Sequence, residues 1–257
     1  EGLILRRTKQ EVLTELPPKR RLVQEIDADD KVYRELMRPV IEMLGSLRAL
    51  HPEARERAVL EEQVGRGERQ ATGVAKAPYV CQFVRALLDG GEKVLLFAHH
   101  HQVMDIYKQE LKTFSPGFIT GRETTLAKMN AVDRFQSGRT DVLCISLRAA
   151  SGLNLQRATC VVFGELDWSP AVHSQAEDRA HRMGQEDSLL CYYLVAPQGS
   201  DAVMQEALGL KVSQFVGLMG DAPQSPEQAE QFANQARRHV ERIVAQMGDN
   251  SGSPNQR

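Results

Sequence analysis

The chain has 257 residues, of which 42% are hydrophobic and 26% charged, and its formal net charge at pH 7 is -2. This composition is ordinary for a globular protein, and the length suits one large α/β domain with helical additions or two small domains. No apolar run reaches the roughly 20 residues of a membrane-spanning helix, so we expect no membrane partner. The near-neutral net charge is compatible with phosphate binding, because basic residues grouped on one face are enough to bind phosphates.

The N-terminal part of the chain reads as a basic segment followed by helices. Residues 1–26 are basic and punctuated by proline, and residues 29–64 are helical in composition. We expect residues 27–75 to form a helical protrusion and a loop. Pro39 and Pro52 predict interruptions of the helices. The stretch GRGERQATG at 65–73 predicts an exposed, mobile loop between this helical protrusion and the next domain.

From residue 76 the pattern changes to short apolar runs that alternate with helices. A first helix is stopped by Gly90 and Gly91, and further helices are predicted near 101–113, 124–137 and 170–183. The apolar runs occupy residues 94–98, 117–120, 141–146, 159–165 and 189–195. Such strands, separated by helices, predict an α/β domain over 76–219 with a parallel sheet and helices on both faces. Residues 220–257 read as a polar helix and a disordered tail.

The cysteines indicate the compartment. None of the four lies in a CxxC pair, and Cys144, Cys160 and Cys191 sit in short apolar runs. This usage predicts buried, reduced thiols of an intracellular protein. We therefore expect the nucleus in a eukaryote, or the cytoplasm or nucleoid in a bacterium.

The most specific segment is ELDWSPAVHSQAEDRAHRMGQ at 165–185. On a helix, Gln175, Arg179 and Arg182 have the spacing i, i+4, i+7 and share one face. Guanidinium groups suit phosphate oxygens, and phosphoryl transfer requires positive charge at the departing phosphate. The spacing alone fits a solvated helix face equally well, with Glu177 and Asp178 pairing to the arginines.

Five segments, in order along the chain, resemble the Swi/Snf family of DNA translocases, whose motors have two RecA-like lobes. QAEDRAHRMGQ resembles motif VI, KVLLFAHHHQVMDIYKQEL at 93–111 resembles motif IV, and ISLRAASGLNL at 145–155 resembles motif V. LRRTKQEVLTELPPK at 5–19 is similar to the segment entering the second lobe, and VVFGELDWSP at 161–170 to the segment before motif VI. The resemblance covers roughly residues 3–219. The sequences FAHH and FGELDWSP resemble the annealing-helicase (HARP-like) branch of this family more than the chromatin-remodelling branch.

The resemblance implies a RecA-like fold and a role for each matching residue. Arg179 and Arg182 match the arginines that complete the ATP site across the lobe interface, and Gln175 matches the opening Gln of motif VI. In motif V, the implied residues of the loop that couples ATP to DNA are Ser146, Gly152 and Asn154. The implied DNA contacts are His99, His100, Arg122, Arg148 and Trp168.

The sequence also departs from the family pattern at several positions. Motif V is short and has Ala150 and Ser151 where glycines are common, and Ser169 stands where the family prefers Asn. Thr120 precedes Gly121 and Arg122 where the family has Asp. These changes affect the details of the loop contacts, and the overall resemblance remains.

The sequence contains neither a GxxxxGK[ST] P-loop nor a DExH-type segment for Mg²⁺. The resemblance places both in the first lobe. We therefore expect ATP and Mg²⁺ to be held mainly by the N-terminal RecA-like lobe of the same polypeptide, with duplex or branched DNA as the other partner. Because the chain begins at Glu1 inside a recognisable segment, we expect a piece of a DNA-dependent ATPase that is inactive alone.

Two other interpretations remain open. The chain could be a RecA-like module that binds DNA or protein without catalysis, or part of an RNA helicase, which the wording D-R-x-H-R-x-G-Q disfavours. A metal site at the triplet His99–His101 is disfavoured, because adjacent side chains diverge and lack Cys or carboxylate partners at ligand spacing. Another set of basic residues suits a solvated surface or a contact with DNA or the other lobe: Arg6, Arg7, Lys9, Lys19, Arg20 and Arg21.

Overall fold

The computed structural model describes residues 19–49, 55–149, 152–182 and 189–208. At its centre lies a six-stranded sheet with the strand order β1-β6-β5-β2-β4-β3, in which every neighbouring pair is parallel. The strands are β1 (Lys19–Glu25), β2 (Val94–Ala98), β3 (Gly117–Ile119), β4 (Val142–Ser146), β5 (Cys160–Phe163) and β6 (Leu189–Val195). The predicted parallel α/β sheet is therefore confirmed.

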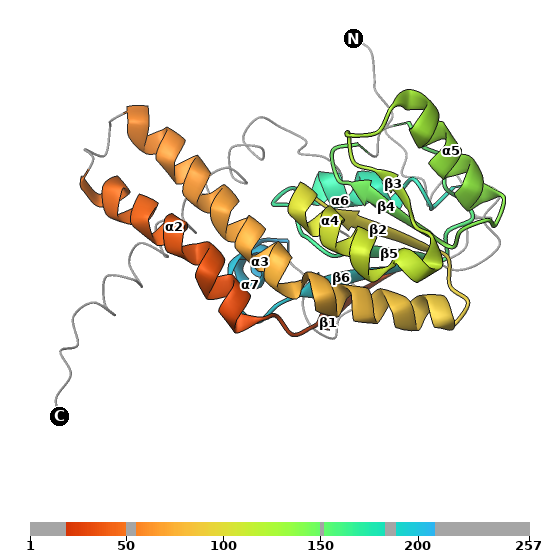
Figure 1. Cartoon of the computed structure of the whole chain (residues 1–257), viewed down its shortest axis with the longest axis horizontal. Coiled ribbons are helices and arrows are strands. Elements are labelled where there is room, and N and C mark those ends of the chain that lie inside the picture. Colours follow the sequence, from red (N-terminus) through yellow and green to blue (C-terminus); the bar gives the residue numbers. More distant parts are fainter. Residues whose placement is uncertain (1–18, 50–54, 150–151, 183–188, 209–257) are drawn as a thin grey trace, which may run out of the picture.

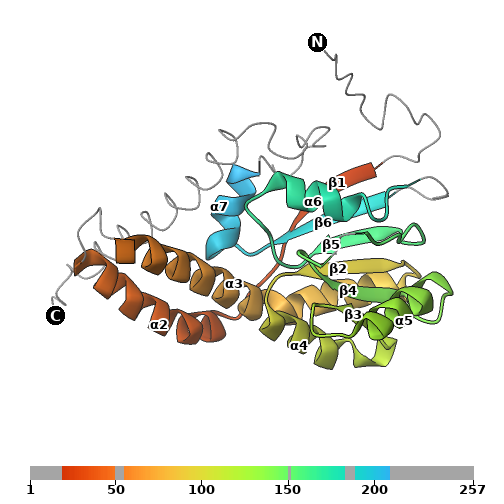
Figure 2. The same cartoon turned by 90° about the horizontal axis from the view of Figure 1, so that it is seen from above.

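Helices cover both faces of the sheet, as predicted (Figures 1 and 2). They are α2 (Asp30–Ala49), α3 (Arg55–Asp89), α4 (His101–Glu110), the 3₁₀ helix η1 (Lys112–Phe114), α5 (Thr125–Gln136), α6 (Pro170–Glu177) and α7 (Ser200–Ala207). Successive strand residues point to opposite faces. Leu95 and Phe97 of β2 join an apolar cluster with α5, α6 and α7, whereas Val94 and Leu96 join another with α3 and α4. Among the helices in the described ranges, none combines the length and apolar character needed to cross a membrane.

Strand β1 was not predicted, because its sequence KRRLVQE is dominated by charge. It forms one edge of the sheet and pairs with β6 from Lys19 opposite Leu189 to Glu25 opposite Val195. Lys19 and Arg21 face inward, where both bind Glu177. Long-range pairing and a buried carboxylate thus create a strand in a segment with little apolar patterning.

The protrusion and the sheet domain are joined by one continuous helix. The loop predicted at 65–73 is wrong, because α3 runs through this segment without a break. The predicted interruption at Pro39 is also wrong, because α2 continues through it, while Pro52 lies outside the described residues. Two glycines of the expected loop allow close packing instead. A Cβ on Gly67 would lie 2.7 Å from Val40, and a Cβ on Gly73 would lie 2.3 Å from Glu165.

Helices α2 and α3 pack against each other as an antiparallel hairpin that extends from the sheet domain (Figure 1). Its small core includes Met37, Val40, Leu44 and Val64, all buried. Farther along α3, Lys76 is fully buried, and its Nζ donates to the carbonyl of Leu194 at 2.8 Å and contacts Asp201. Burial raises the pKa of Asp201, although Lys76 stabilises its carboxylate. This ion pair ties α3 to β6 and α7.

Gly164, at the end of β5, is tightly packed between two helices. A Cβ at this position would lie 2.1 Å from Tyr107 Oη and 3.0 Å from Val80. We expect Gly164→Ala to lower the free energy of unfolding by about 1–3 kcal/mol, because the core has no room for the methyl group. Urea unfolding measures this change. The control is Gly45→Ala in α2, where no atom lies within 4 Å of the new Cβ. Equal stabilities of the two variants would contradict the prediction.

Candidate functional site

The predicted DNA-contacting residues gather at the carboxyl ends of the strands. His99 and His100 follow β2, Arg122 follows β3, Arg148 follows β4, and Trp168 follows β5. Because all strands are parallel, these loops meet at the carboxyl ends of the strands, where α/β proteins bind ligands. The structure therefore brings together segments that are separated in sequence.

The helix expected at 170–183 is shorter than predicted. Helix α6 ends at Glu177, and the N–H of Arg179 bonds to the carbonyl of Ala176 at 3.1 Å in a tightened turn. The prediction that Gln175, Arg179 and Arg182 form one helical stripe is therefore wrong. Gln175 is exposed on α6, whereas both arginines are half-buried beyond the helix end. Arg182 Nε donates to the carbonyl of Asp178 at 3.0 Å.

Arg179 has an unusual environment for a guanidinium group. Its Nε is buried, and no hydrogen-bond acceptor for it exists among the described residues. Its carbonyl accepts the N–H of Leu155 at 2.9 Å, which joins the loop after β4 to the segment after α6. A buried donor without a partner is costly and rare in native proteins. An anionic ligand at this position would remove that cost.

The loop after β4 contains the predicted coupling residues. Ser146 is the last residue of β4 and is buried, whereas Gly152 and Asn154 are exposed. Gly152 has φ of +78°, a conformation that favours glycine. The carbonyl of Asn154 accepts a hydrogen bond from Gln136 Nε2 at 2.7 Å. Ala150 and Ser151, where the loop departs from the family pattern, lie outside the described residues.

Glu177 forms a buried ionic cluster that sequence analysis missed. Its carboxylate is fully buried and accepts hydrogen bonds from Lys19 Nζ at 2.7 Å, Arg21 Nη2 at 2.6 Å and Tyr193 Oη at 2.8 Å. Glu177 therefore does not belong to a solvated helix face. The partners also assign a structural role to Lys19 and Arg21, while Arg6, Arg7 and Lys9 lie outside the described residues.

The Glu177 cluster predicts a loss of stability in acid. Burial alone would raise the pKa of Glu177, but Arg21 and Lys19 lower it from 4.5 to about 2. The resulting stabilisation, about 3 kcal/mol, is present above the ordinary pKa and is lost as the pH falls from about 4.5 toward 2. We expect the difference in unfolding free energy between wild type and Glu177→Gln to shrink between about pH 5 and pH 3. A difference that is constant over this range would contradict the assignment.

The loop between β2 and α4 is held by Glu165, a second carboxylate that sequence analysis missed. Oε2 of Glu165 accepts the N–H groups of His99 at 2.7 Å and His100 at 2.8 Å. Oε1 lies 2.6 Å from His100 Nδ1. Burial and the nearby charge of Arg69 lower the pKa of His99 to about 4. At neutral pH, His99 is therefore uncharged and adds no positive charge to this surface.

The segment after β5 is fixed by both α6 and α3. Asp167 Oδ1 accepts the N–H of Ser169 at 2.9 Å, and His173 Nε2 accepts the N–H of Asp167 at 3.2 Å. Burial lowers the pKa of His173, so its ring is neutral and suited to accept this bond. Arg69 on α3 approaches Asp167 at 3.9 Å. Trp168 is half-buried and packs against the apolar core.

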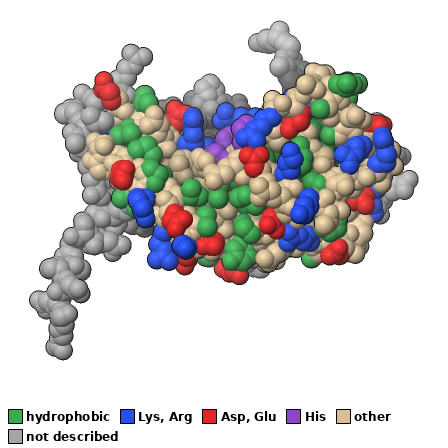
Figure 3. All heavy atoms as spheres, viewed as in Figure 1, with side chains coloured by type: hydrophobic (Ala, Val, Ile, Leu, Met, Phe, Trp, Pro, Cys, Tyr) green, Lys and Arg blue, Asp and Glu red, His purple; other side chains and the backbone are tan. Residues whose placement is uncertain are grey.

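Positive charge surrounds the histidines. Arg148, exposed after β4, and Arg69 both lie close enough to His99 to lower its pKa. Figure 3 shows histidine side chains at this point of the surface, with Lys and Arg side chains on either side. Such an arrangement suits a polyanion. The described residues contain no group of three or more His, Cys, Asp or Glu side chains placed to hold a metal ion.

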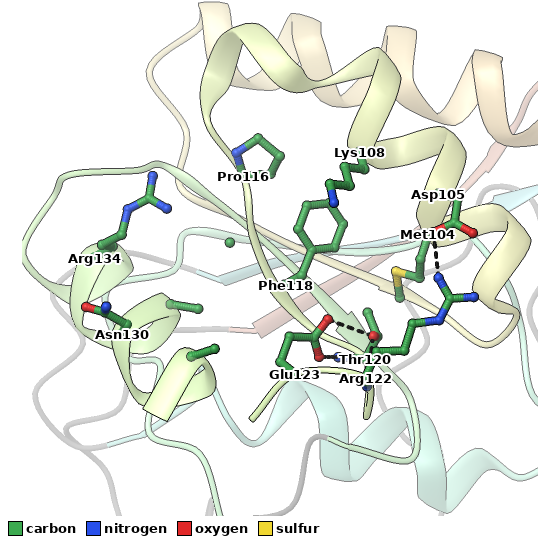
Figure 4. Close-up of a pocket in the computed structure, with 13 residues that line it drawn as sticks. Met104, Asp105, Lys108, Pro116, Phe118, Thr120, Arg122, Glu123, Asn130 and Arg134 are labelled. Atoms are coloured by element: carbon green, nitrogen blue, oxygen red, sulfur yellow. Dashed lines mark hydrogen bonds and ion pairs between the residues drawn. The ribbon is translucent and has the colours of Figure 1, made fainter. Parts of the chain in front are cut away.

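Arg122 lies beside a groove of about 470 Å³ along the edge strand β3 (Figure 4). Helix α4 lines one side of the groove, α5 lines the other, and Phe118 lies between them. Arg122 Nη1 donates to Asp105 Oδ1 at 2.7 Å, and both side chains are about half exposed. Exposed ion pairs contribute little stability, so Asp105 competes only weakly with a phosphate for this guanidinium.

Comparisons with known proteins agree with the resemblance. The family of the helicase conserved C-terminal domain matches residues 75–184. A SWI/SNF-related matrix-associated actin-dependent regulator of chromatin subfamily A-like protein 1 from Drosophila melanogaster is 33% identical over 85% of this chain and 29% of its own length. The human DNA annealing helicase and endonuclease ZRANB3 is 32% identical over 89% of this chain and 21% of its own length. The chain thus spans less than a third of these relatives.

Solved structures share the fold. The Sulfolobus solfataricus SWI2/SNF2 ATPase core in complex with dsDNA has a TM-score of 0.63 and 19% identity, covering 82% of this chain and 48% of that one. The C-terminal part of the Fun30 ATPase domain has a TM-score of 0.58 and 17% identity, covering 89% of this chain and 99% of that one. The relatives and the fold together show that this chain carries the helicase C-terminal domain, a RecA-like lobe, of the SWI/SNF family.

Proposed function

We propose that this chain is the C-terminal motor lobe of an ATP-dependent translocase that moves along double-stranded DNA. It would work against an N-terminal RecA-like lobe of the same polypeptide, with the ATP and DNA clefts between the two. The observation that carries the proposal is the buried Nε of Arg179, which has no acceptor among the described residues. A guanidinium placed in this way is suited to the phosphates of a nucleotide held by another lobe.

The residues of this chain fit a nucleotide only in part. Arg179 and Arg182 would face its phosphates and stabilise negative charge in the transition state, and Gln175 would help to join the lobes. When bound, ATP with Mg²⁺ supplies free energy through phosphoryl transfer. In this proposal the first lobe holds the metal.

DNA contact and the ATP site would be coupled through the loop after β4. The N–H of Leu155 bonds to the carbonyl of Arg179, so movement of this loop displaces the arginine segment. At the start of the loop, Ser146 and Arg148 would approach the DNA backbone, while Gly152 and Asn154 would change conformation with the nucleotide state. DNA contacts from His99, His100, Arg122 and Trp168 would complete the track at the same edge.

Arg148 offers a test of the DNA surface. It is exposed, and no side-chain partner holds it among the described residues. We expect Arg148→Ala to weaken duplex binding at every sequence and to reduce the slope of log affinity against log salt by about 1, because one phosphate contact is lost. Arg139→Ala is a control, because Arg139 precedes β4 and therefore lies at the amino ends of the strands, away from the proposed DNA contacts. An unchanged salt slope in Arg148→Ala would remove this residue from the proposed track.

The experiment that tests the proposal is ATP hydrolysis by the full-length protein with duplex DNA, forked DNA, single-stranded DNA and RNA. We expect strong stimulation by duplex DNA and little by RNA. Selective stimulation by forked DNA would support an annealing activity like the one named for the human relative. Absence of stimulation by every DNA would contradict the proposal and favour a module that binds without catalysis.

A further inference from the structure

A single carboxylate, Glu165, connects three parts of the chain beside the candidate DNA surface. Glu165 lies two residues after β5, and only 4% of its side chain is exposed. One carboxylate oxygen accepts both backbone N–H groups of His99 and His100, and the other contacts the His100 ring. Helix α3 lies directly behind it, since a Cβ on Gly73 would come within 2.3 Å of Oε1.

Glu165 also fixes the chain immediately before helix α4. His100 is the N-cap residue of α4, yet its side chain makes no capping hydrogen bond. The first N–H groups of a helix require acceptors from elsewhere, and negative charge is favourable at this end. Glu165 accepts the N–H groups of the two residues before the first helical residue, and it places a negative charge near this end of α4 from a position 65 residues away. The conformation of the β2–α4 loop therefore depends on this carboxylate.

The same residue begins the segment that leads to the arginines. From Glu165 the chain passes through Asp167 and Trp168 into α6 and then to Arg179. The loop that carries His99 and His100 is thus fixed directly to the connection between β5 and α6. The packing of Gly73 also places the protrusion helix α3 in this contact.

We propose that Glu165 is a positioning residue that holds the β2–α4 loop in its DNA-contacting conformation relative to the segment leading to Arg179. The assignment rests on the proposed function, because it supposes that DNA binding stimulates ATP turnover. Without the carboxylate, two partly buried N–H groups lose their acceptor, and the loop must move to satisfy them. DNA would then bind to a β2–α4 loop that is no longer held in its binding conformation.

Four variants of the full-length protein separate position from charge. Glu165→Ala removes the acceptor. Glu165→Gln keeps it, because the amide oxygen can accept both N–H groups and the amide NH₂ can donate to His100 Nδ1 in the tautomer whose proton is on Nε2. Gly73→Ala retains every functional side chain but displaces the carboxylate by its new methyl group. Gly45→Ala is the matched control for a glycine replacement in a helix with open space around it.

The measured quantity is the duplex DNA concentration that gives half-maximal ATPase stimulation. We expect Glu165→Ala and Gly73→Ala to raise it about 3- to 30-fold, the usual range for residues that couple two sites. Glu165→Gln should remain within about threefold of wild type, and Gly45→Ala should match wild type. Thermal unfolding of each variant shows whether it folds. If Glu165→Ala does not fold, Gly73→Ala decides the question.

Two results would overturn the assignment while leaving the proposed function intact. In one, the wild-type ATPase responds to DNA, and Gly73→Ala and any folded Glu165→Ala protein respond at the same concentration as wild type. In the other, Glu165→Gln loses as much as Glu165→Ala, which would show that charge acts rather than position. If DNA does not stimulate ATP hydrolysis by the wild-type protein, the proposed function itself is contradicted.

Discussion

Replacing Arg179 with alanine is expected to lower the DNA-stimulated ATPase rate of the full-length protein by roughly 10³- to 10⁵-fold, the usual effect of removing an arginine finger. The buried Nε of Arg179 has no acceptor within the described chain, which fits a group whose partner arrives with the nucleotide. Steady-state hydrolysis at saturating duplex DNA measures the effect. Arg179→Lys should recover little activity, because lysine keeps the charge but not the planar fork of donors.

The control for this prediction is Arg139→Ala. Arg139 pairs with Asp133 on the surface, and its side chain is 57% exposed. Such a pair contributes between 0 and about 1 kcal/mol, so its loss should change neither folding nor hydrolysis appreciably. An Arg179→Ala protein that folds normally and retains wild-type turnover would remove Arg179 from the transition state.

Glu177→Ala is expected to cost about 3–5 kcal/mol of unfolding free energy, the usual penalty for breaking a buried ion pair. The substitution leaves Lys19 and Arg21 without their carboxylate and deprives Tyr193 Oη of its acceptor. Because Arg21 lies on β1 and Glu177 ends α6, the cluster fastens the edge strand to the helix that precedes Arg179. Urea unfolding of residues 1–257 with the wild-type chain alongside measures the loss.

The exposed pair of Arg139 and Asp133 again provides the comparison. Removing it should cost less than about 1 kcal/mol, because water and salt screen it. If Glu177→Ala costs no more than Arg139→Ala, the buried cluster does not stabilise the fold as its geometry indicates. The double variant Arg21→Ala/Glu177→Ala should cost less than the sum of the single variants, because both remove the same contact.

The sheet was predictable because its signal is local. The runs VLLFA and LLCYYLV coincide with β2 and β6, since wholly apolar strands stand out between helices. β1 was not predictable in this way, because its charged residues are buried only through a carboxylate more than 150 residues distant. The continuity of α3 was hidden by Gly67 and Gly73, which read as a loop but serve close packing.

The candidate site was predicted in part for the same reason. In the parallel sheet, the loops after β2, β3, β4 and β5 all lie at the carboxyl ends of the strands. The order of the motifs along the chain was therefore enough to predict that their residues lie close together. The length of α6 was not predictable, because the carbonyl of Arg179 accepts the N–H of Leu155 instead of continuing the helix. Glu165 carried a signal, a charge two residues after a buried strand, but its partners in the β2–α4 loop are visible only in the fold.

The central claim is that the arginines of this lobe act on a nucleotide held by another lobe of the same polypeptide. The most direct test measures ATP hydrolysis with saturating duplex DNA by purified residues 1–257 and by the full-length protein, side by side. We predict DNA-stimulated turnover by the full-length protein and none above background by residues 1–257. Appreciable turnover by residues 1–257 that is abolished by Arg179→Ala would contradict the claim.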